Sequence, residues 1–179
     1  IGDGGQGTVI LNPDGATQQE YASKKSILED RQRQRLGAIH APDTTRDGVD
    51  FHLLANIELL DEINGIKDMG GSGIGLYRSE FLYLSMYPHI PSEEDHFQTY
   101  SRLLKAMPDR TVTIRTFDLG GRKLAREVLH IHEDNPVLGM RGIRLCLNYP
   151  DIFRPQLKAL LRASVYGNLH IMLPMVCCV

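Results

Sequence analysis

Residues 51–176 alternate between short apolar runs rich in β-branched residues and longer stretches with helical spacing. The strand patterns cover residues 51–57, 73–77, 111–117 and 169–176. The helical patterns cover residues 58–68, 92–107 and 151–164. Strands separated by helices predict parallel βαβ units. Four such strands fit either the first half of an eight-stranded α/β barrel or a complete small doubly wound sheet, and periodicity alone does not decide between them.

The first 40 residues follow a different pattern. Thr8–Leu11 is a short β-branched strand pattern, and residues 16–36 are polar, charged and free of Pro and Gly, which predicts a solvent-bridging helix. Gly37 ends this helix, and a linker at residues 41–43 follows, so we place a domain boundary near residue 40.

The chain opens with glycines at positions 2, 4 and 7 in the spacing G-x-G-x-x-G. A dinucleotide site would require a strand before this motif and a helix after it. Here a strand pattern follows, so we interpret the motif as a turn. The chain begins without Met and ends in an apolar strand pattern, whereas natural termini are usually polar. We therefore expect a piece of a longer protein.

Composition narrows the class of protein. The 179 residues are 42% hydrophobic and 23% charged, which is typical of one globular domain, or of one domain with an appendage. A net charge of -2 argues against nucleic acid as a partner. No apolar run approaches the roughly 18 residues that a membrane helix requires, and no signal peptide is evident. The three cysteines lack framework spacing, which favours reduced thiols and a cytoplasmic location.

Two arginines stand at the ends of predicted strands. Arg78 follows the run Gly73–Tyr77, and Arg115 comes late in the run that begins at Thr111. In parallel α/β folds the carboxyl ends of the strands face the ligand. A buried guanidinium is costly unless it is paired, and its planar donors match phosphate or carboxylate. The pair therefore suggests one anionic ligand. The sequence leaves open the alternative of internal pairing, Arg78 with Glu80 or Arg115 with Asp118.

Other polar groups carry weaker signals. Arg141, in a turn after Asn135, is either a third ligand of the same anion or a surface arginine. Residues 120–123 form a basic loop suited to phosphate, although they lack the Walker A pattern. His130–Asp134 contains metal-capable residue types without a regular element to direct them, so no metal site is predicted there. Cys177 and Cys178 are expected to be core thiols.

Five segments occur in order over almost the whole chain and carry a family resemblance. They are Leu54–Ile57, Gly73–Leu82, Arg115–Gly121, Asn135–Arg141 and Phe153–Ser164. Together they resemble enzyme I of the bacterial sugar phosphotransferase system, a phosphoenolpyruvate-protein phosphotransferase. Pyruvate phosphate dikinases and phosphoenolpyruvate synthases share the Gly-x-Gly-Leu-x-Arg element and are less similar elsewhere.

The resemblance implies a fold and a reaction. Residues 1–40 would be the end of a swivelling phosphohistidine domain plus a linker helix, and residues 41–179 the N-terminal half of a phosphoenolpyruvate-binding TIM (β/α)8 barrel. Phosphoenolpyruvate would phosphorylate an active-site histidine with the help of magnesium (Mg2+), and the phosphoryl group would pass to the phosphocarrier protein HPr. Arg78 and Arg115 resemble the two arginines that hold the substrate phosphate, and Arg141 resembles a supporting arginine.

The resemblance also implies that several parts lie outside this chain. The phosphorylated histidine would lie upstream, and the Mg2+ ligands and a general-acid cysteine downstream, so we expect no catalytic residue and no metal ligand here, and an inactive chain. The intact protein would be a homodimer. Arg122 stands where the family usually has an acidic residue, and Met140 where it has a bulkier one. A non-catalytic phosphoenolpyruvate-binding module and a piece of a dikinase relative remain alternative interpretations.

Overall fold

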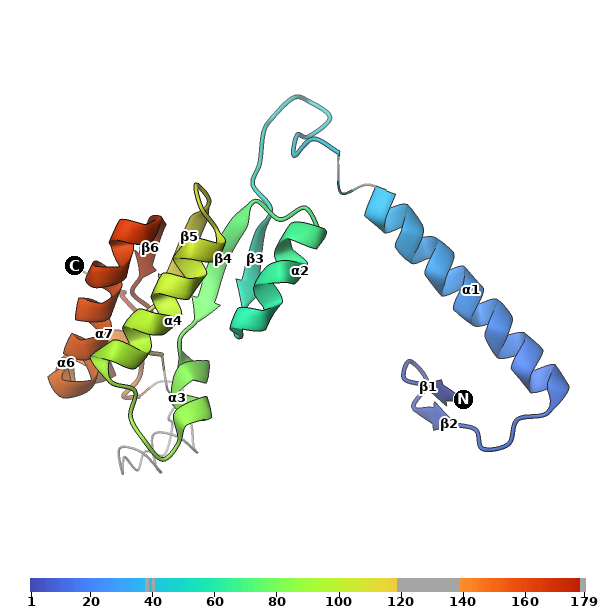
Figure 1. Cartoon of the computed structure of the whole chain (residues 1–179), viewed down its shortest axis with the longest axis horizontal. Coiled ribbons are helices and arrows are strands. Elements are labelled where there is room, and N and C mark those ends of the chain that lie inside the picture. The colour runs from blue at the N-terminus through green and yellow to red at the C-terminus, as the bar shows by residue number, and fades with distance from the viewer. Residues whose placement is uncertain (38, 40, 119–138, 178–179) are drawn as a thin grey trace. The chain divides into compact units, whose positions relative to one another are not determined.

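The computed structural model describes residues 1–37, 39, 41–118 and 139–177 (Figure 1). The chain divides into two compact units, Ile1–Pro42 and Asp43–Val179, and each is described by itself. Within the described ranges, no helix combines the length and the apolar character that crossing a membrane would need.

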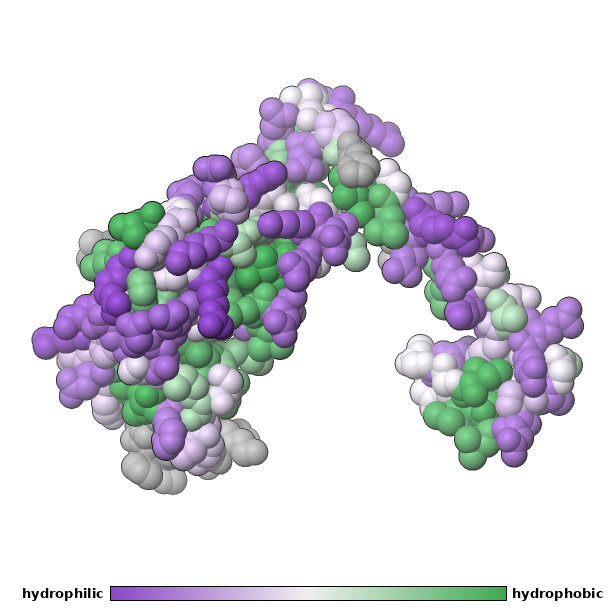
Figure 2. Space-filling view, viewed as in Figure 1, coloured by the Kyte–Doolittle hydropathy of each residue, from purple (hydrophilic) through white to green (hydrophobic). Residues whose placement is uncertain are grey.

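The first unit is a hairpin followed by a long helix. Strands β1 (Gly2–Asp3) and β2 (Thr8–Val9) pair antiparallel. Asp3 Oδ1 accepts hydrogen bonds from the backbone N–H groups of Gly5 and Gln6, both at 3.0 Å. The glycine-rich motif is therefore a hairpin turn, as the sequence predicted. Helix α1 (Gly15–Gly37) covers the predicted helical stretch, and Figure 2 shows that hydrophilic side chains dominate its visible face.

The second unit is built on a four-stranded parallel sheet, which confirms the predicted parallel α/β arrangement, and the half-barrel stays a prediction. Its strands are β3 (Leu54–Ile57), β4 (Gly73–Arg78), β5 (Thr111–Arg115) and β6 (Asn168–Met172). They lie in the spatial order β3-β4-β5-β6, and all three neighbouring pairs are parallel. Glycines bring β4 close to its neighbours, because a Cβ atom at Gly73 would lie 2.6 Å from the Thr111 carbonyl oxygen.

Helices connect these strands. They are α2 (Ile63–Asp68), α3 (Glu80–Met86), α4 (Glu93–Ala106), α6 (Gly142–Asn148) and α7 (Pro150–Ala163). Short 3-10 turns precede α2 at Leu60–Glu62 and follow α7 at Ser164–Tyr166. The predicted capping box starts α4, since Ser92 Oγ accepts from the Asp95 N–H and Asp95 Oδ2 accepts from the Ser92 N–H at 2.8 Å. Sequence periodicity did not predict α3 and α6.

The main core lies between the sheet and one layer of helices. Figure 1 shows α2, α4 and α7 along one side of the sheet. Their apolar residues form one buried cluster with those of the strands. Its largest fully buried members are Ile74, Tyr100, Leu103, Leu104, Met107, Ile114 and Leu160. A second, smaller cluster joins α3 to α6 and α7 through Tyr83, Leu145 and Ile152, with Phe117 among them.

Cys177 is exposed, so the expectation of a core thiol is wrong at this position. Strand β6 ends at Met172, and Pro174, which lacks a backbone N–H for a sheet ladder, follows two residues later. The chain beyond it is therefore not part of the strand, and β6 itself is largely exposed. Cys178 lies outside the described residues.

Candidate anion-binding site

Arg78 and Arg115 are the last residues of β4 and β5, and they are partners across this parallel pair. The residues before them, Tyr77 and Ile114, are also partners, and both belong to the core under the helices. Successive side chains of a strand point to opposite faces. Both arginines therefore point away from the helix layer, and their predicted placement at the carboxyl ends of adjacent parallel strands is confirmed.

Arg115 is held by two carboxylates. Its Nε donates to Glu80 Oε1 at 3.2 Å, and its Nη2 lies 3.1 Å from Glu80 Oε2. Its Nη1 lies 3.5 Å from Asp118 Oδ2. Glu80 is the first residue of α3, one residue beyond the junction residue Ser79, and its side chain is 9% exposed. The sequence alternative of an Arg115–Asp118 pair is thus confirmed, with Glu80 as the closer partner.

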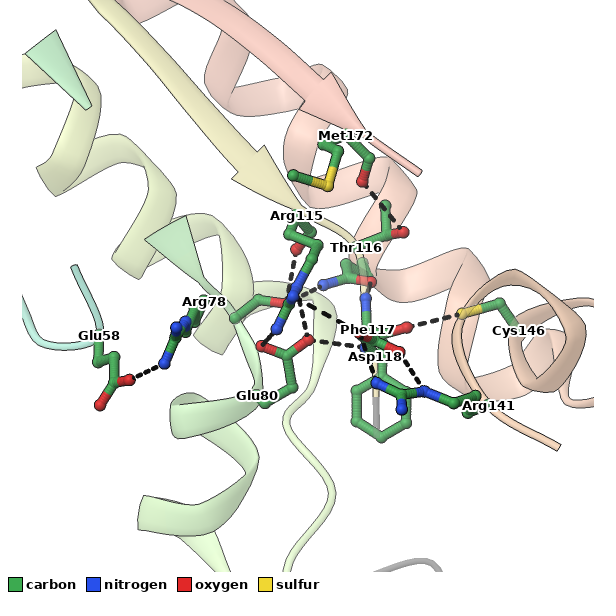
Figure 3. A network of polar contacts seen from close by, with 12 residues as sticks. Glu58, Arg78, Glu80, Arg115, Thr116, Phe117, Asp118, Arg141, Cys146 and Met172 are labelled. Atoms are coloured by element: carbon green, nitrogen blue, oxygen red, sulfur yellow. Dashed lines mark hydrogen bonds and ion pairs between the residues drawn. The ribbon is translucent and has the colours of Figure 1, made fainter. Parts of the chain in front are cut away.

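Arg141 joins the same cluster from the other side of Asp118. Its Nε and Nη2 donate to the two carboxylate oxygens of Asp118, each at 3.0 Å, in the bidentate geometry that suits a guanidinium. These hydrogen bonds raise the pKa of Arg141 above its usual value. The backbone N–H of Asp118 donates to Glu80 Oε1 at 2.7 Å. Arg115, Arg141, Glu80 and Asp118 therefore form one continuous polar cluster (Figure 3).

Arg78 stands apart from this cluster. Its Nη1 donates to Glu58, which directly follows β3, so the sequence alternative of an Arg78–Glu80 pair is wrong. Figure 3 shows Arg78 turned towards Glu58 and Arg115 turned towards Glu80. The Arg78 side chain is 41% exposed, against 21% for Arg115 and Arg141. Of the three arginines, Arg78 is therefore the one that a solvent-borne anion reaches most readily.

Sequence reasoning missed Glu58 as the partner of Arg78. The position of Glu58 in the sequence could have indicated this partner, because Glu58 is the first residue after β3. Asp118 likewise lies three residues after the end of β5. The rule that placed the arginines at the ligand-facing edge of the sheet applies equally to carboxylates. This edge therefore carries three arginines, each with a carboxylate partner, and a phosphate group competes with carboxylates for the same planar donors.

Three carboxylates stand near the strand ends in the described part of the chain. Glu58, Glu80 and Asp118 each contact an arginine, and no group of three His, Cys, Asp or Glu residues stands together in the described part of the chain. Magnesium is commonly bound by only one or two carboxylates together with water and substrate phosphates, so the location of Mg2+ stays a prediction. The basic loop at residues 120–123 and the His130–Asp134 segment lie outside the described residues.

Comparisons with known proteins give a consistent set of relatives. Residues 31–179 match the family described as PEP-utilising enzyme, PEP-binding domain. The chain is 45% identical over 176 residues to a phosphoenolpyruvate-protein phosphotransferase of Staphylococcus epidermidis, covering 98% of this chain and 31% of the relative. It is 42% identical over 176 residues to the protein of the same name from Bacillus subtilis, again covering 98% of this chain and 31% of that relative.

A third relative, from Geobacillus stearothermophilus, carries the same name. It is 43% identical over 176 residues, covering 98% of this chain and 30% of the relative. The chain therefore spans about a third of the length of these curated relatives. The resemblance that the five sequence segments indicated is confirmed.

Proposed function

Because the chain belongs to the PEP-utilising enzymes through their PEP-binding domain, we propose that its arginines bind the phosphate group of phosphoenolpyruvate for phosphoryl transfer. The observation that carries this proposal is the in-register pair of Arg78 and Arg115 at the carboxyl ends of adjacent parallel strands. Phosphoryl transfer depends mainly on positioning and on neutralising charge, and paired arginines supply both.

The three arginines have different roles in this proposal. Arg115 is the fixed donor, because Glu80 and Asp118 hold its guanidinium from two sides. Arg78 is the exchangeable donor, because its single described carboxylate partner, Glu58, is itself 34% exposed and can give way to a phosphate oxygen. Arg141 supports the site through Asp118, which it neutralises, so that the carboxylate does not repel the ligand.

The reaction of the whole protein is part of the same proposal. Phosphoenolpyruvate would phosphorylate a histidine, and the phosphoryl group would then pass to HPr, with Mg2+ bound by residues other than the carboxylates described above. The names of the relatives favour this reaction over that of the dikinases. We further propose that the parallel sheet is half of a TIM barrel, that residues 1–40 end a phosphohistidine domain, and that the intact protein is a cytoplasmic homodimer.

A titration tests the binding role on the chain of 179 residues. Phosphoenolpyruvate should shift the ¹⁵N–¹H resonances of the Arg78 and Arg115 side chains saturably. Inorganic phosphate should shift the same resonances, and pyruvate, which lacks the phosphate, should not. Arg115→Lys should weaken binding about tenfold or more, because lysine cannot replace the planar fork.

The matched control is Arg162→Lys. Arg162 on α7 also pairs with two carboxylates, Glu93 and Glu94, but these lie on α4 and not at the strand ends. This variant should leave binding unchanged. Equal losses in both variants, or shifts with pyruvate as large as those with phosphoenolpyruvate, would contradict the assigned role.

A further inference from the structure

A chain of buried polar side chains lies behind the two arginine-bearing strand ends. Ser79, His96, Tyr100 and Gln156 are each 0% exposed, and Tyr83 is 3% exposed. These residues come from the β4–α3 junction, α3, α4 and α7. Burial of polar groups is costly unless they are hydrogen-bonded. The hydrogen bonds among these five side chains therefore show which groups they hold in place.

Gln156 is the centre of the chain of contacts. Its Oε1 accepts a hydrogen bond from the backbone N–H of Phe117 at 2.9 Å. Its Nε2 donates to Ser79 Oγ and to the Tyr100 hydroxyl, each at 3.0 Å. Ser79 Oγ in turn donates to the Arg115 carbonyl oxygen at 2.7 Å. Gln156 therefore holds the peptide groups on both sides of Thr116, one directly and one through Ser79.

The directions of these hydrogen bonds follow from one backbone group. The Phe117 N–H can only donate, so the Gln156 amide must face it with its oxygen and offer its NH₂ group to the two hydroxyls. Ser79 then has its proton for the Arg115 carbonyl. The Tyr100 hydroxyl has its proton for His96 Nδ1, 2.9 Å away. His96 is therefore assigned the tautomer with its proton on Nε2, which donates to the Tyr83 hydroxyl at 3.2 Å.

The segment that this chain of contacts holds carries the charged groups of the site. The β5 ladder ends at Arg115, the Thr116 N–H still donates to the Met172 backbone carbonyl oxygen at 2.9 Å, and side chains then hold the backbone groups of Phe117 and Asp118. Besides the contact of Gln156, the Phe117 carbonyl accepts from Cys146 Sγ at 3.5 Å, and the Asp118 N–H donates to Glu80 at 2.7 Å. Arg115 and Asp118 are thus mounted on backbone that buried side chains fix.

We propose that Gln156 is a positioning residue of the anion site, which fixes the Arg115–Asp118 backbone through the Phe117 N–H and through Ser79. The proposal deepens the function proposed above and rests on it as far as the ligand is phosphoenolpyruvate. An apolar side chain of the same size would fill the space equally well and would leave the Phe117 N–H and the Ser79 hydroxyl without this partner. The backbone that carries Arg115 and Asp118 would then lose part of its support, and the Arg115 guanidinium would move relative to Glu80.

Two substitutions on the full 179-residue chain separate the contacts of Gln156. Gln156→Met keeps the length of the side chain and removes all three hydrogen bonds. Gln156→Glu keeps an acceptor for the Phe117 N–H and removes at least one of the two donations, because a carboxyl group has at most one O–H donor. The control is Leu160→Val, one turn along α7, which removes a methylene from the fully buried core without touching a polar partner. The readouts are the Arg115 Nε–H resonance without ligand and the dissociation constant for phosphoenolpyruvate.

Gln156→Met should shift the Arg115 Nε–H resonance. It should also weaken phosphoenolpyruvate binding about tenfold, the loss expected when Arg115 no longer makes one of its hydrogen bonds to the charged phosphate. Gln156→Glu should shift the Arg115 resonance while the Phe117 amide resonance stays closer to its original position. Leu160→Val should change neither readout. An unchanged Arg115 resonance in Gln156→Met, or the same shifts in Leu160→Val, would overturn the positioning role.

The two proposals fail in different ways. If the original chain does not bind phosphoenolpyruvate but Gln156→Met still shifts Arg115, the proposed function fails and the positioning role stands. If the variants do not fold, the His96 ¹⁵N shifts of the original chain decide, because they report the tautomer directly. A proton on Nε2 supports the assigned Gln156 orientation, and a proton on Nδ1 contradicts it.

Discussion

His96 makes the stability of the second unit depend on pH in a way that can be calculated. Its ring is fully buried between the hydroxyls of Tyr83 and Tyr100. Burial lowers the pKa of His96 from 6.5 to about 4, and the neighbouring Asp95 acts in the opposite direction. The unfolded chain therefore takes up a proton at this position near pH 6.5, whereas the folded chain does so only near pH 4.

The sign and size of the effect follow from linkage. Above pH 6.5 His96 is neutral in both states and the stabilisation is complete. As the pH falls from 6.5 to 4, the unfolded state binds the extra proton, and the free energy of unfolding decreases by about 1.4 kcal/mol per pH unit. The difference between 6.5 and about 4 corresponds to a total loss of about 3 kcal/mol. At pH 4.5 about 2.5 kcal/mol of this should already be lost.

Urea unfolding followed by far-ultraviolet circular dichroism measures this loss at pH 7 and pH 4.5. His96→Gln is the reference, because its amide does not titrate and all other groups of the chain are shared. The original chain should lose about 2.5 kcal/mol more than the variant between the two pH values. Equal losses would refute the reasoning, and would show that His96 is protonated or solvated in the folded chain.

Three further predictions concern single contacts and the edges of the sheet. Glu58→Gln should tighten phosphoenolpyruvate binding several-fold in the titration above, because it removes the carboxylate that competes for Arg78; weaker binding would mean that Glu58 assists the ligand. Gly142→Ala should lower the free energy of unfolding by about 1–3 kcal/mol, because φ at Gly142 is +56° and the new Cβ would lie 2.8 Å from Met175 Cγ. The control is Gly65→Ala, which should not destabilise the chain, because a Cβ at Gly65 meets nothing within 4 Å. Within the described residues β3 and β6 are the outer strands of the sheet and carry exposed Leu54 and Ile171, so the chain should self-associate in size-exclusion chromatography; a monodisperse monomer with a sharp thermal transition would argue against the half-barrel proposal.

Sequence periodicity predicted the parts of the fold whose signal is long and regular. The parallel sheet, the capped helix α4 and the position of both strand-end arginines were all readable from spacing and turn residues. Helices α3 and α6 span only seven residues each, less than the length over which helical spacing becomes distinct. Strand β3 begins at Leu54 rather than at the predicted residue 51, because the residues before it do not join the ladder with β4.

The partners of the site residues could not be predicted, because they depend on register between distant elements. Arg78 pairs with Glu58, 20 residues earlier, rather than with Glu80, two residues later. The preference of Arg78 for Glu58 over Glu80 becomes apparent only once β3 is known to lie beside β4 in the sheet. Gln156 presents the same difficulty: in a helical pattern a glutamine reads as a surface residue, yet it is fully buried by contacts with three other segments.

The central claim is that Arg78 and Arg115 together bind a phosphate group, and a crystal structure of this chain grown with phosphoenolpyruvate tests it most directly. The account predicts phosphate oxygens at hydrogen-bond distance, roughly 2.7–2.9 Å, from both guanidinium groups, with Arg78 released from Glu58 and Arg115 still held by Glu80. A phosphate bound elsewhere, or an Arg78–Glu58 pair that persists at saturating ligand, would contradict it.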